Sequence, residues 1–141
     1  MNKLMETLKM KLNGSTLITL ALALGVVFYL FASNSNDPNK TISAKDAYSL
    51  MTSDSSVVVL DVRTVGEYQS GHIKNSLLIP LQELNNRLNE LKTKKEKKIL
   101  VFCRSGNRSG QAQKILEQNG YNAVNISGGV ISWSNNGLPL E

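Results

Sequence analysis

The sequence predicts an α/β domain with a mainly parallel sheet flanked by helices. Short, continuous apolar runs alternate with segments whose apolar residues recur at helical spacing. Such runs are typical of strands buried on both faces, and their alternation with helices is typical of a parallel sheet. A long apolar segment near the N-terminus stands apart from this pattern. About 100 residues therefore remain for the domain, which is enough for one modest core.

Four apolar runs predict the strands, and no run is long enough for a helix of ordinary length. They are Val57–Leu60, Ser76–Ile79, Ile99–Phe102 and Ala123–Ile126. Pro80 follows the second run directly and ends that strand, because proline cannot donate to a sheet ladder.

Helices are predicted in the segments that lie before and between these runs. Ser43 and Asp46 resemble a capping box, which opens a helix that ends near Met51. Leucines at 81, 84, 88 and 91 recur at helical spacing. A third helix is predicted over Ser109–Asn119, where a glycine follows as a stop signal. Two further glycines, at 128–129, predict a tight turn before a short helix.

The apolar segment near the N-terminus has the composition of a membrane span. Of the 18 residues from Ser15 to Ala32, 14 are apolar, and no charged residue occurs from Leu12 to Asn36. As a helix, its core would extend about 25 Å, at the short end of the range that crosses a bilayer. It is longer than the apolar region of most signal peptides. We therefore expect a single-pass transmembrane anchor, with a cleaved signal peptide as the alternative.

The charges beside this segment predict its orientation. Three lysines precede it, at positions 3, 9 and 11. The positive-inside rule then places the N-terminus in the cytoplasm and the domain in the periplasm or outside the cell. If the segment is cleaved, the domain is secreted or periplasmic. The chain thus divides into a basic cytoplasmic segment, an anchor, a polar linker and the α/β domain, at residues 1–14, 15–32, 33–40 and 41–141.

Composition excludes several classes of function. The net charge is +5, and five lysines gather at 92–98. No aromatic residue interleaves that run, so it is interpreted as a solvated helix end, and no nucleic-acid partner is expected. Cys103 is the only cysteine, which excludes an intrachain disulfide and a multi-cysteine metal site.

Cys103 follows the third predicted strand, and ligands of parallel sheets bind at that end of the strands. Five residues separate it from the predicted helix: Arg104, Ser105, Gly106, Asn107 and Arg108. A short loop with a glycine can turn its N–H groups inward, and a helix N-terminus is positive. The two arginines add permanent charge. All of these features favour the thiolate and so predict a nucleophile, whereas the alternative is an inert core cysteine.

The segment Cys-Arg-Ser-Gly-Asn-Arg-Ser at 103–109 resembles the active loop of rhodanese-type sulfurtransferases. Leu-Asp-Val-Arg at 60–63, Glu-Tyr at 67–68 and Gly-His-Ile at 71–73 resemble the early part of that family's domain. Gly-Gly at 128–129, Trp133 and Gly-Leu-Pro at 137–139 resemble its closing part. The resemblance covers about 41–141 and does not include the apolar segment.

The resemblance implies that Cys103 takes a sulfur atom from a donor anion such as thiosulfate and holds it as a persulfide. A thiophilic acceptor, cyanide or a thiol, would then remove it. Residues 104–108 would bind the donor, and no metal or organic cofactor is implied. Asp61 and Arg63 are expected to support the site as scaffold, with Asp61 the more able to touch the loop.

Two other functions remain open at this stage. Phosphatases of related fold have a longer loop with five residues between cysteine and arginine, whereas only four separate Cys103 and Arg108. The resemblance links the shorter, tighter loop to sulfur rather than phosphate substrates. A sulfur carrier or interaction module at the membrane, with little turnover on small donors, is the alternative from another class. His72 could act as a base, although a structural hydrogen bond is favoured, and Trp133 is expected in the core.

Overall fold

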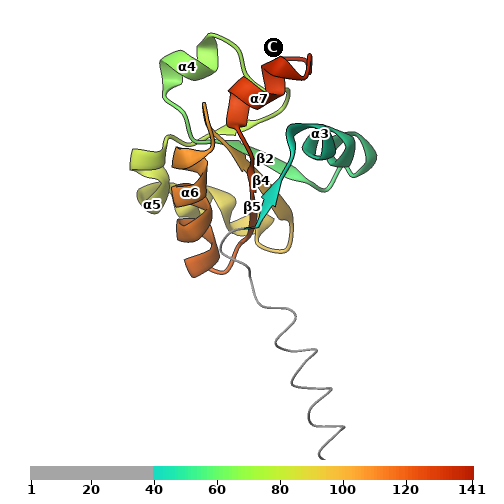
Figure 1. The fold of residues 1–141 in the computed structure, drawn as a ribbon. Coiled ribbons are helices and arrows are strands. Elements are labelled where there is room, and N and C mark those ends of the chain that lie inside the picture. Colours follow the sequence, from blue (N-terminus) through green and yellow to red (C-terminus); the bar gives the residue numbers. More distant parts are fainter. Residues whose placement is uncertain (1–39) are drawn as a thin grey trace, which may run out of the picture. The chain divides into compact units, whose positions relative to one another are not determined.

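The computed structural model describes residues 40–141, which form a five-stranded parallel sheet with helices on both faces (Figure 1). The strands lie in the order β1-β5-β4-β2-β3, and each adjacent pair is parallel. They are β1 Thr41–Ile42, β2 Val58–Asp61, β3 Leu77–Leu78, β4 Lys98–Phe102 and β5 Asn122–Ile126. The predicted fold class is confirmed.

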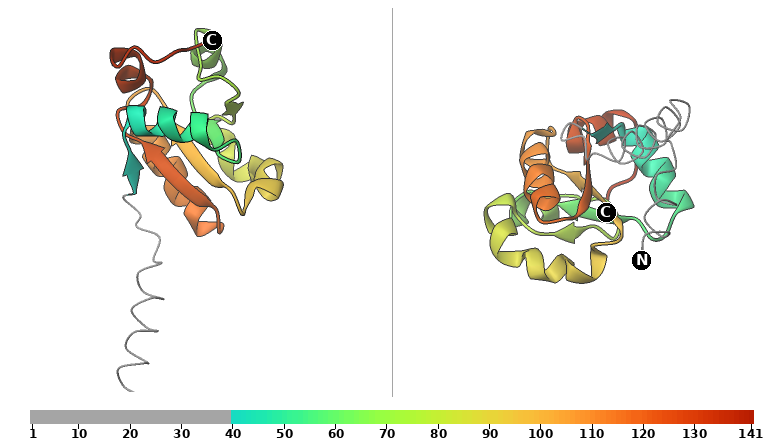
Figure 2. Two further views of the ribbon diagram at one scale, coloured as in Figure 1. Left: turned by 90° about the vertical axis from the view of Figure 1, so that its right-hand side faces the viewer. Right: turned by 90° about the horizontal axis from the view of Figure 1, so that it is seen from below.

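Helices cover the sheet from two sides (Figure 1). They are α3 Ala44–Ser53, α4 Val65–Gln69, α5 Leu84–Arg87, α6 Asn107–Gln118 and α7 Gly129–Asn135, with 3₁₀ segments η1 Leu81–Glu83 and η2 Leu88–Lys94. α5 and α6 pack on one face, and α3 and α7 pack on the other. In the left view of Figure 2, α3 lies across the strands.

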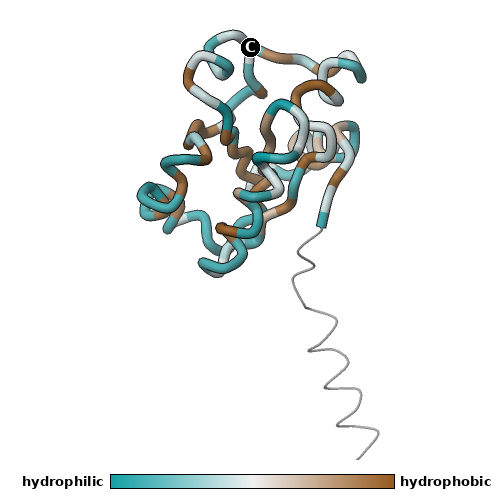
Figure 3. Tube along the Cα trace, turned by 60° about the vertical axis from the view of Figure 1, so that its left-hand side comes forward, coloured by the Kyte–Doolittle hydropathy of each residue, from teal (hydrophilic) through white to brown (hydrophobic). Residues whose placement is uncertain are grey.

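The side chains of β4 alternate between the two faces and so build both halves of the core. Ile99, Val101 and Cys103 join the cluster beneath α5 and α6. Leu100 and Phe102 join the cluster beneath α3 and α7. Figure 3 shows hydrophobic stretches of the chain in the middle of the domain and hydrophilic stretches in many of its outer turns. Burying each large aliphatic side chain contributes roughly 1.5–3 kcal/mol.

The segment between β3 and β4 departs from the single helix predicted there. It forms η1, the short helix α5 and η2 in succession. Leu81, Leu84, Leu88 and Leu91 are spaced by three, four and three residues, which a continuous α-helix would also place on one face. The spacing therefore predicts the buried face but not the break. The broken helix buries Leu84 and Leu91 completely.

Other boundaries differ by a few residues. α6 begins at Asn107, two residues before the predicted start, because the carbonyl of Gly106 already accepts the N–H of Gly110. β1 and α4 were not predicted. β1 has only two residues, and α4 is a five-residue helix with no buried side chain, so neither leaves an apolar pattern in the sequence.

Among residues 40–141, no helix is both long enough and apolar enough to cross a bilayer. The predicted anchor at 15–32 lies outside the described residues, as do the basic segment at 1–14 and nearly all of the linker.

Candidate active site

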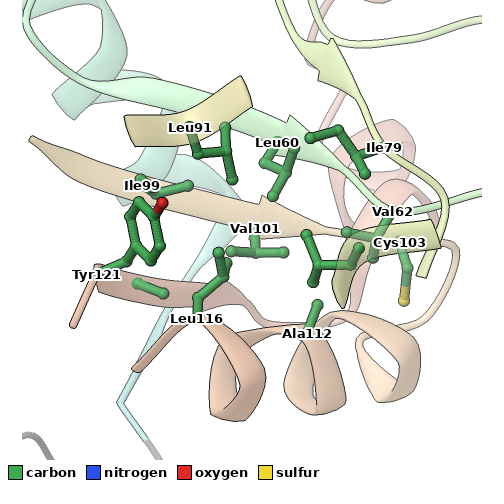
Figure 4. Packing of buried hydrophobic residues seen from close by; sticks show 12 residues of the cluster. Leu60, Val62, Ile79, Leu91, Ile99, Val101, Cys103, Ala112, Leu116 and Tyr121 are labelled. Atoms are coloured by element: carbon green, nitrogen blue, oxygen red, sulfur yellow. The ribbon is translucent and has the colours of Figure 1, made fainter. Parts of the chain in front are cut away.

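Cys103 lies at the carboxyl edge of the sheet, directly after β4. Asp61 and Phe102 are register partners, so β2 and β4 end side by side. Strand alternation turns the Cys103 side chain to the same face as Val101, near the first turns of α6 (Figure 4). The residue is only 1% exposed. The sulfur is thus held at the end of the core rather than on an open surface.

Hydrogen-bond donors surround the Cys103 sulfur. The N–H of Gly106 donates to Sγ at 3.1 Å, and the Ser109 hydroxyl lies 3.4 Å from it. Burial acts to raise the pKa of the Cys103 thiol. The Ser109 hydroxyl and the N–H groups of Ser109, Gly106 and Ser105 outweigh burial, so the pKa lies below that of an ordinary thiol. The predicted nest is present, and it favours the thiolate.

The loop closes onto the sulfur through a left-handed residue. Gly106 has φ +103° and caps α6, whose positive end faces the site. A side chain at this φ would be strained, and only glycine adopts the conformation readily. Arg104, Ser105 and Asn107 are exposed on the outside of this turn. The loop therefore offers backbone donors inward and side chains outward.

Arg108 has a partner that the sequence did not predict. Its guanidinium donates to both carboxylate oxygens of Glu67, at 2.7 and 2.8 Å. Arg108 is the main cause of a Glu67 pKa of about 2, well below the usual value. Glu67 in turn raises the pKa of Arg108, and the Cys103 sulfur adds to that effect. Arg108 is therefore held by a carboxylate close to the site, and its charge is partly neutralised.

Glu67 lies in the first turn of α4, which positions its carboxylate beside Arg108. Thr64 caps the helix by accepting from the Glu67 N–H, and the Glu67 carboxylate accepts from the Thr64 N–H in return. One carboxylate thus completes a capping box and holds Arg108. In the sequence Glu67 stands out only as part of the Glu-Tyr motif at 67–68, and the structure identifies its partner.

Asp61 and Arg63 form a buried ion pair. Arg63 donates to the Asp61 carboxylate from its side chain and its own N–H, with a shortest distance of 2.7 Å. Arg63 also donates to the carbonyl of Gly71 at 2.8 Å. The predicted scaffold role agrees with this geometry. The expected contact of Asp61 with the loop does not occur, because in the described part of the chain its carboxylate bonds only to Arg63.

α7 holds the loop from the other side of the sheet. The N–H of Val130 donates to the carbonyl of Cys103 at 2.8 Å, and that of Ile131 donates to the carbonyl of Arg104 at 3.1 Å. Gly129 allows this approach, because a Cβ on it would lie 2.2 Å from the Cys103 oxygen. The sequence predicted a turn and a short helix here but gave no sign that they contact the loop.

A buried amide also reaches the loop from β5. Asn125 accepts from the Ser109 hydroxyl and donates to the carbonyl of Gly106. It was not among the predicted site residues. The only signal for it was a polar residue inside an apolar strand run, at a position where a buried polar group needs a partner.

His72 and Trp133, which the sequence also singled out, make structural contacts away from the Cys103 sulfur. The His72 ring lies 3.2 Å from the Tyr68 carbonyl and stacks on the Tyr68 ring, as expected for a structural histidine. Trp133 is buried and donates to the carbonyl of Pro139. Within residues 40–141, no group of histidine, cysteine and carboxylate residues could hold a metal ion.

A groove of about 520 Å³ borders the loop between α4 and α7. Arg104 lines it from the loop, Glu67 and Ser70 from the α4 side, and Val130 and Ile131 from α7. Ile131 is 45% exposed. The groove gives a route by which a larger molecule can approach the loop.

Comparisons with known proteins agree with the resemblance in the sequence. The model of the rhodanese-like domain family matches residues 43–136. A sulfurtransferase of Allochromatium vinosum is 39% identical over 60% of this chain and 78% of its own length. The putative sulfur carrier protein YrkF of Bacillus subtilis is 39% identical over 58% of this chain, but over only 44% of its own length. The crystal structure of a rhodanese-related protein from Thermoplasma volcanium superposes with a TM-score of 0.66. It is 38% identical and covers 72% of this chain and 97% of that one.

Proposed function

Because the chain belongs to the rhodanese-like family, we propose that it transfers sulfane sulfur from a donor such as thiosulfate to a thiophilic acceptor, through a persulfide on Cys103. The observation that carries the proposal is the set of donors around the Cys103 sulfur, which lower the pKa of the thiol despite its burial. A thiolate is the form that attacks. Cyanide and thiols are the acceptors expected for such a persulfide.

The first half-reaction loads the cysteine. The Cys103 thiolate attacks the outer sulfur of thiosulfate and forms a new S–S bond. The original S–S bond breaks, and sulfite leaves with its electron pair. The donor and the leaving group are both anions, so the N–H groups of the loop and the positive end of α6 suit both. Arg104, exposed on the loop, is placed to attract them.

The second half-reaction removes the transferred sulfur from Cys103. Cyanide or a thiolate attacks the outer sulfur of the persulfide, and the Cys103 thiolate leaves. Thiocyanate or an acceptor persulfide is released, and the enzyme returns to its first state. The same N–H groups that bind the thiolate also stabilise it as a leaving group. No electron or proton from outside is needed.

A thiosulfate–cyanide assay on the full chain tests this proposal. The wild-type chain should produce thiocyanate, and Cys103→Ser should produce none above background. The matched control is Ser55→Ala, a substitution of an exposed serine on the loop between α3 and β2. Transfer that survives in Cys103→Ser would exclude the persulfide mechanism.

A sulfur carrier that serves a protein partner is the second candidate. One observation favours it: the groove beside the loop is far larger than cyanide or thiosulfate. A carrier would load one sulfur on Cys103 from thiosulfate but turn over slowly with cyanide. Stoichiometric loading without steady turnover would therefore favour this candidate over the enzyme.

The sequence also supports a cellular location for the chain. We propose that residues 15–32 anchor the chain in a membrane, with the domain in the periplasm or outside the cell, on the composition and the preceding lysines. A signal peptide cleaved from a secreted domain is the alternative. Protease added to cells whose outer membrane, where one is present, has been permeabilised should digest the domain. A domain that is protected while the inner membrane is intact, and digested once that membrane is lysed, would contradict the proposed orientation.

A further inference from the structure

A buried polar network connects the active loop with β5. The Ser109 hydroxyl lies 2.6 Å from the amide oxygen of Asn125, and the amide nitrogen of Asn125 lies 3.2 Å from the carbonyl of Gly106. Ser109 is fully buried, and Asn125 is 9% exposed. Burying an amide is costly unless it is hydrogen-bonded, and both polar atoms of the Asn125 amide find their partners in the segment 106–109.

The contacts fix the orientation of the Asn125 amide. A carbonyl oxygen can only accept a hydrogen bond, so the group of Asn125 that faces Gly106 must be the NH₂. The amide oxygen then faces Ser109, and an amide oxygen also can only accept. The proton of the 2.6 Å bond therefore belongs to Ser109.

That hydroxyl has one proton and several acceptors. Besides Asn125 at 2.6 Å, the carbonyl of Gly106 lies at 3.1 Å and the Cys103 sulfur at 3.4 Å. When the proton points to Asn125, a lone pair of Ser109 faces the sulfur, which suits a thiol that donates S–H. When the proton points to the sulfur, it stabilises the thiolate but leaves two oxygens 2.6 Å apart without a proton between them.

We propose that Asn125 is a positioning residue of the sulfur-transfer reaction, whose amide oxygen competes with the Cys103 sulfur for the hydroxyl proton of Ser109. The inference rests on the proposed function for its role but not for its geometry. Asn125 limits how strongly Ser109 stabilises the anion, and its NH₂ holds the loop residue whose own N–H donates to the sulfur. A less stabilised Cys103 thiolate attacks the donor more readily, whereas a more stabilised thiolate leaves the persulfide more readily. Asn125 thus sets a compromise between the two half-reactions.

Apart from Arg104, which is exposed on the outside of the loop, the charged groups near the sulfur are held in ion pairs. This leaves the Ser109 hydroxyl as the movable donor inside the loop. From α6, Arg108 faces Cys103 and is bound to Glu67 of α4. At the end of β2, Asp61 is bound to Arg63. The first turn of α7 contributes no charged side chain. A change in the Ser109 hydroxyl is therefore the simplest way for this site to respond to the charge on sulfur.

A double-mutant cycle on the full chain tests the competition. The readout is the rate at which iodoacetamide alkylates Cys103, measured across a pH series, because this rate follows the thiolate fraction. We compare wild type, Ser109→Ala, Asn125→Ala and the double variant. With Asn125 absent, the nearest competing acceptor is gone and only the carbonyl of Gly106 still competes, so the hydroxyl donates to the sulfur more often. The factor by which Ser109→Ala slows alkylation on the acid side should then be about tenfold larger than in the wild-type background.

An equal factor in both backgrounds would overturn the proposal, because Ser109 and Asn125 would then act independently. If Asn125→Ala does not fold, Asn125→Leu, which has a similar volume and no acceptor, takes its place. Alkylation requires no sulfur transfer. A chain inactive with thiosulfate can therefore still support the competition, and an active chain can still refute it.

Discussion

Replacing Gly129 with alanine should separate α7 from the active loop. Gly129 has φ +52°, and its added Cβ would lie 2.2 Å from the Cys103 carbonyl oxygen and 2.7 Å from the Arg104 carbonyl carbon. Backbone atoms cannot give way as a flexible side chain can. The first turn of α7 must then retreat, and the hydrogen bonds from Val130 and Ile131 to the loop are lost.

The magnitude follows from three contributions. A left-handed alanine costs about 1–2 kcal/mol. Two lost hydrogen bonds cost about 1 kcal/mol each, and residual overpacking adds about 1 kcal/mol or more. Gly129→Ala should therefore lower the free energy of unfolding by about 4–5 kcal/mol and abolish sulfur transfer. Gly137→Ala is the matched control, because Gly137 has φ +67° with no atom within 4 Å of its Cβ, so it should cost only about 1–2 kcal/mol.

Urea unfolding of both full-length variants measures the difference, from the shift in midpoint at an unchanged m-value. The thiosulfate–cyanide rate measures the effect on the loop. If Gly129→Ala is as stable and as active as Gly137→Ala, the contact between α7 and the loop does not hold the site, and the reasoning is refuted.

Three further predictions concern the Glu67–Arg108 pair, the Cys103 thiolate and Arg104. The pKa of Glu67 is lowered to about 2, so its pair with Arg108 stabilises the fold above about pH 4.5 and is lost as pH falls toward about 2. Between about pH 7 and pH 3, wild type should therefore lose about 1–2 kcal/mol more than Glu67→Gln in urea unfolding, and equal losses would contradict the pair. Glu90→Gln, in an exposed pair, is the control. The pKa of Cys103 is lowered, so its alkylation by iodoacetamide should reach half-maximal rate at a lower pH than a free cysteine does, and a midpoint at or above that of free cysteine would contradict the nest. Arg104→Gln should raise the KM for thiosulfate several-fold with little effect on stability, because Arg104 is exposed, and an unchanged KM would exclude it from donor binding.

The sequence predicted the parts of the fold that bury apolar residues. The strand before Cys103 has a continuous apolar pattern and α6 has a periodic one, so a parallel sheet with a helix packed on it could be inferred. The loop between them was predicted because a cysteine, a glycine and arginines gather at the end of a strand. α4 was missed because none of its residues is buried, although Thr64 and Glu67 form a capping box that is visible in the sequence.

The rest of the site depends on contacts between distant segments, which no local pattern encodes. Glu67 and Arg108 are 41 residues apart, and Asn125 reaches Ser109 across 16 residues. The expectation for Asp61 failed for a related reason. Its position beside the loop was right, but Arg63, two residues on, occupies the carboxylate. Register predicts which strand ends meet, and it does not predict which side chains pair there.

The most direct test of the central claim is the mass of the intact chain after incubation with thiosulfate and removal of excess donor. If Cys103 carries the transferred sulfur, wild type should gain the mass of one sulfur atom, and Cys103→Ser should gain none. Cyanide should then return wild type to its original mass and release thiocyanate. A wild-type chain that gains no sulfur, or a Cys103→Ser chain that gains as much as wild type, would contradict the persulfide on Cys103.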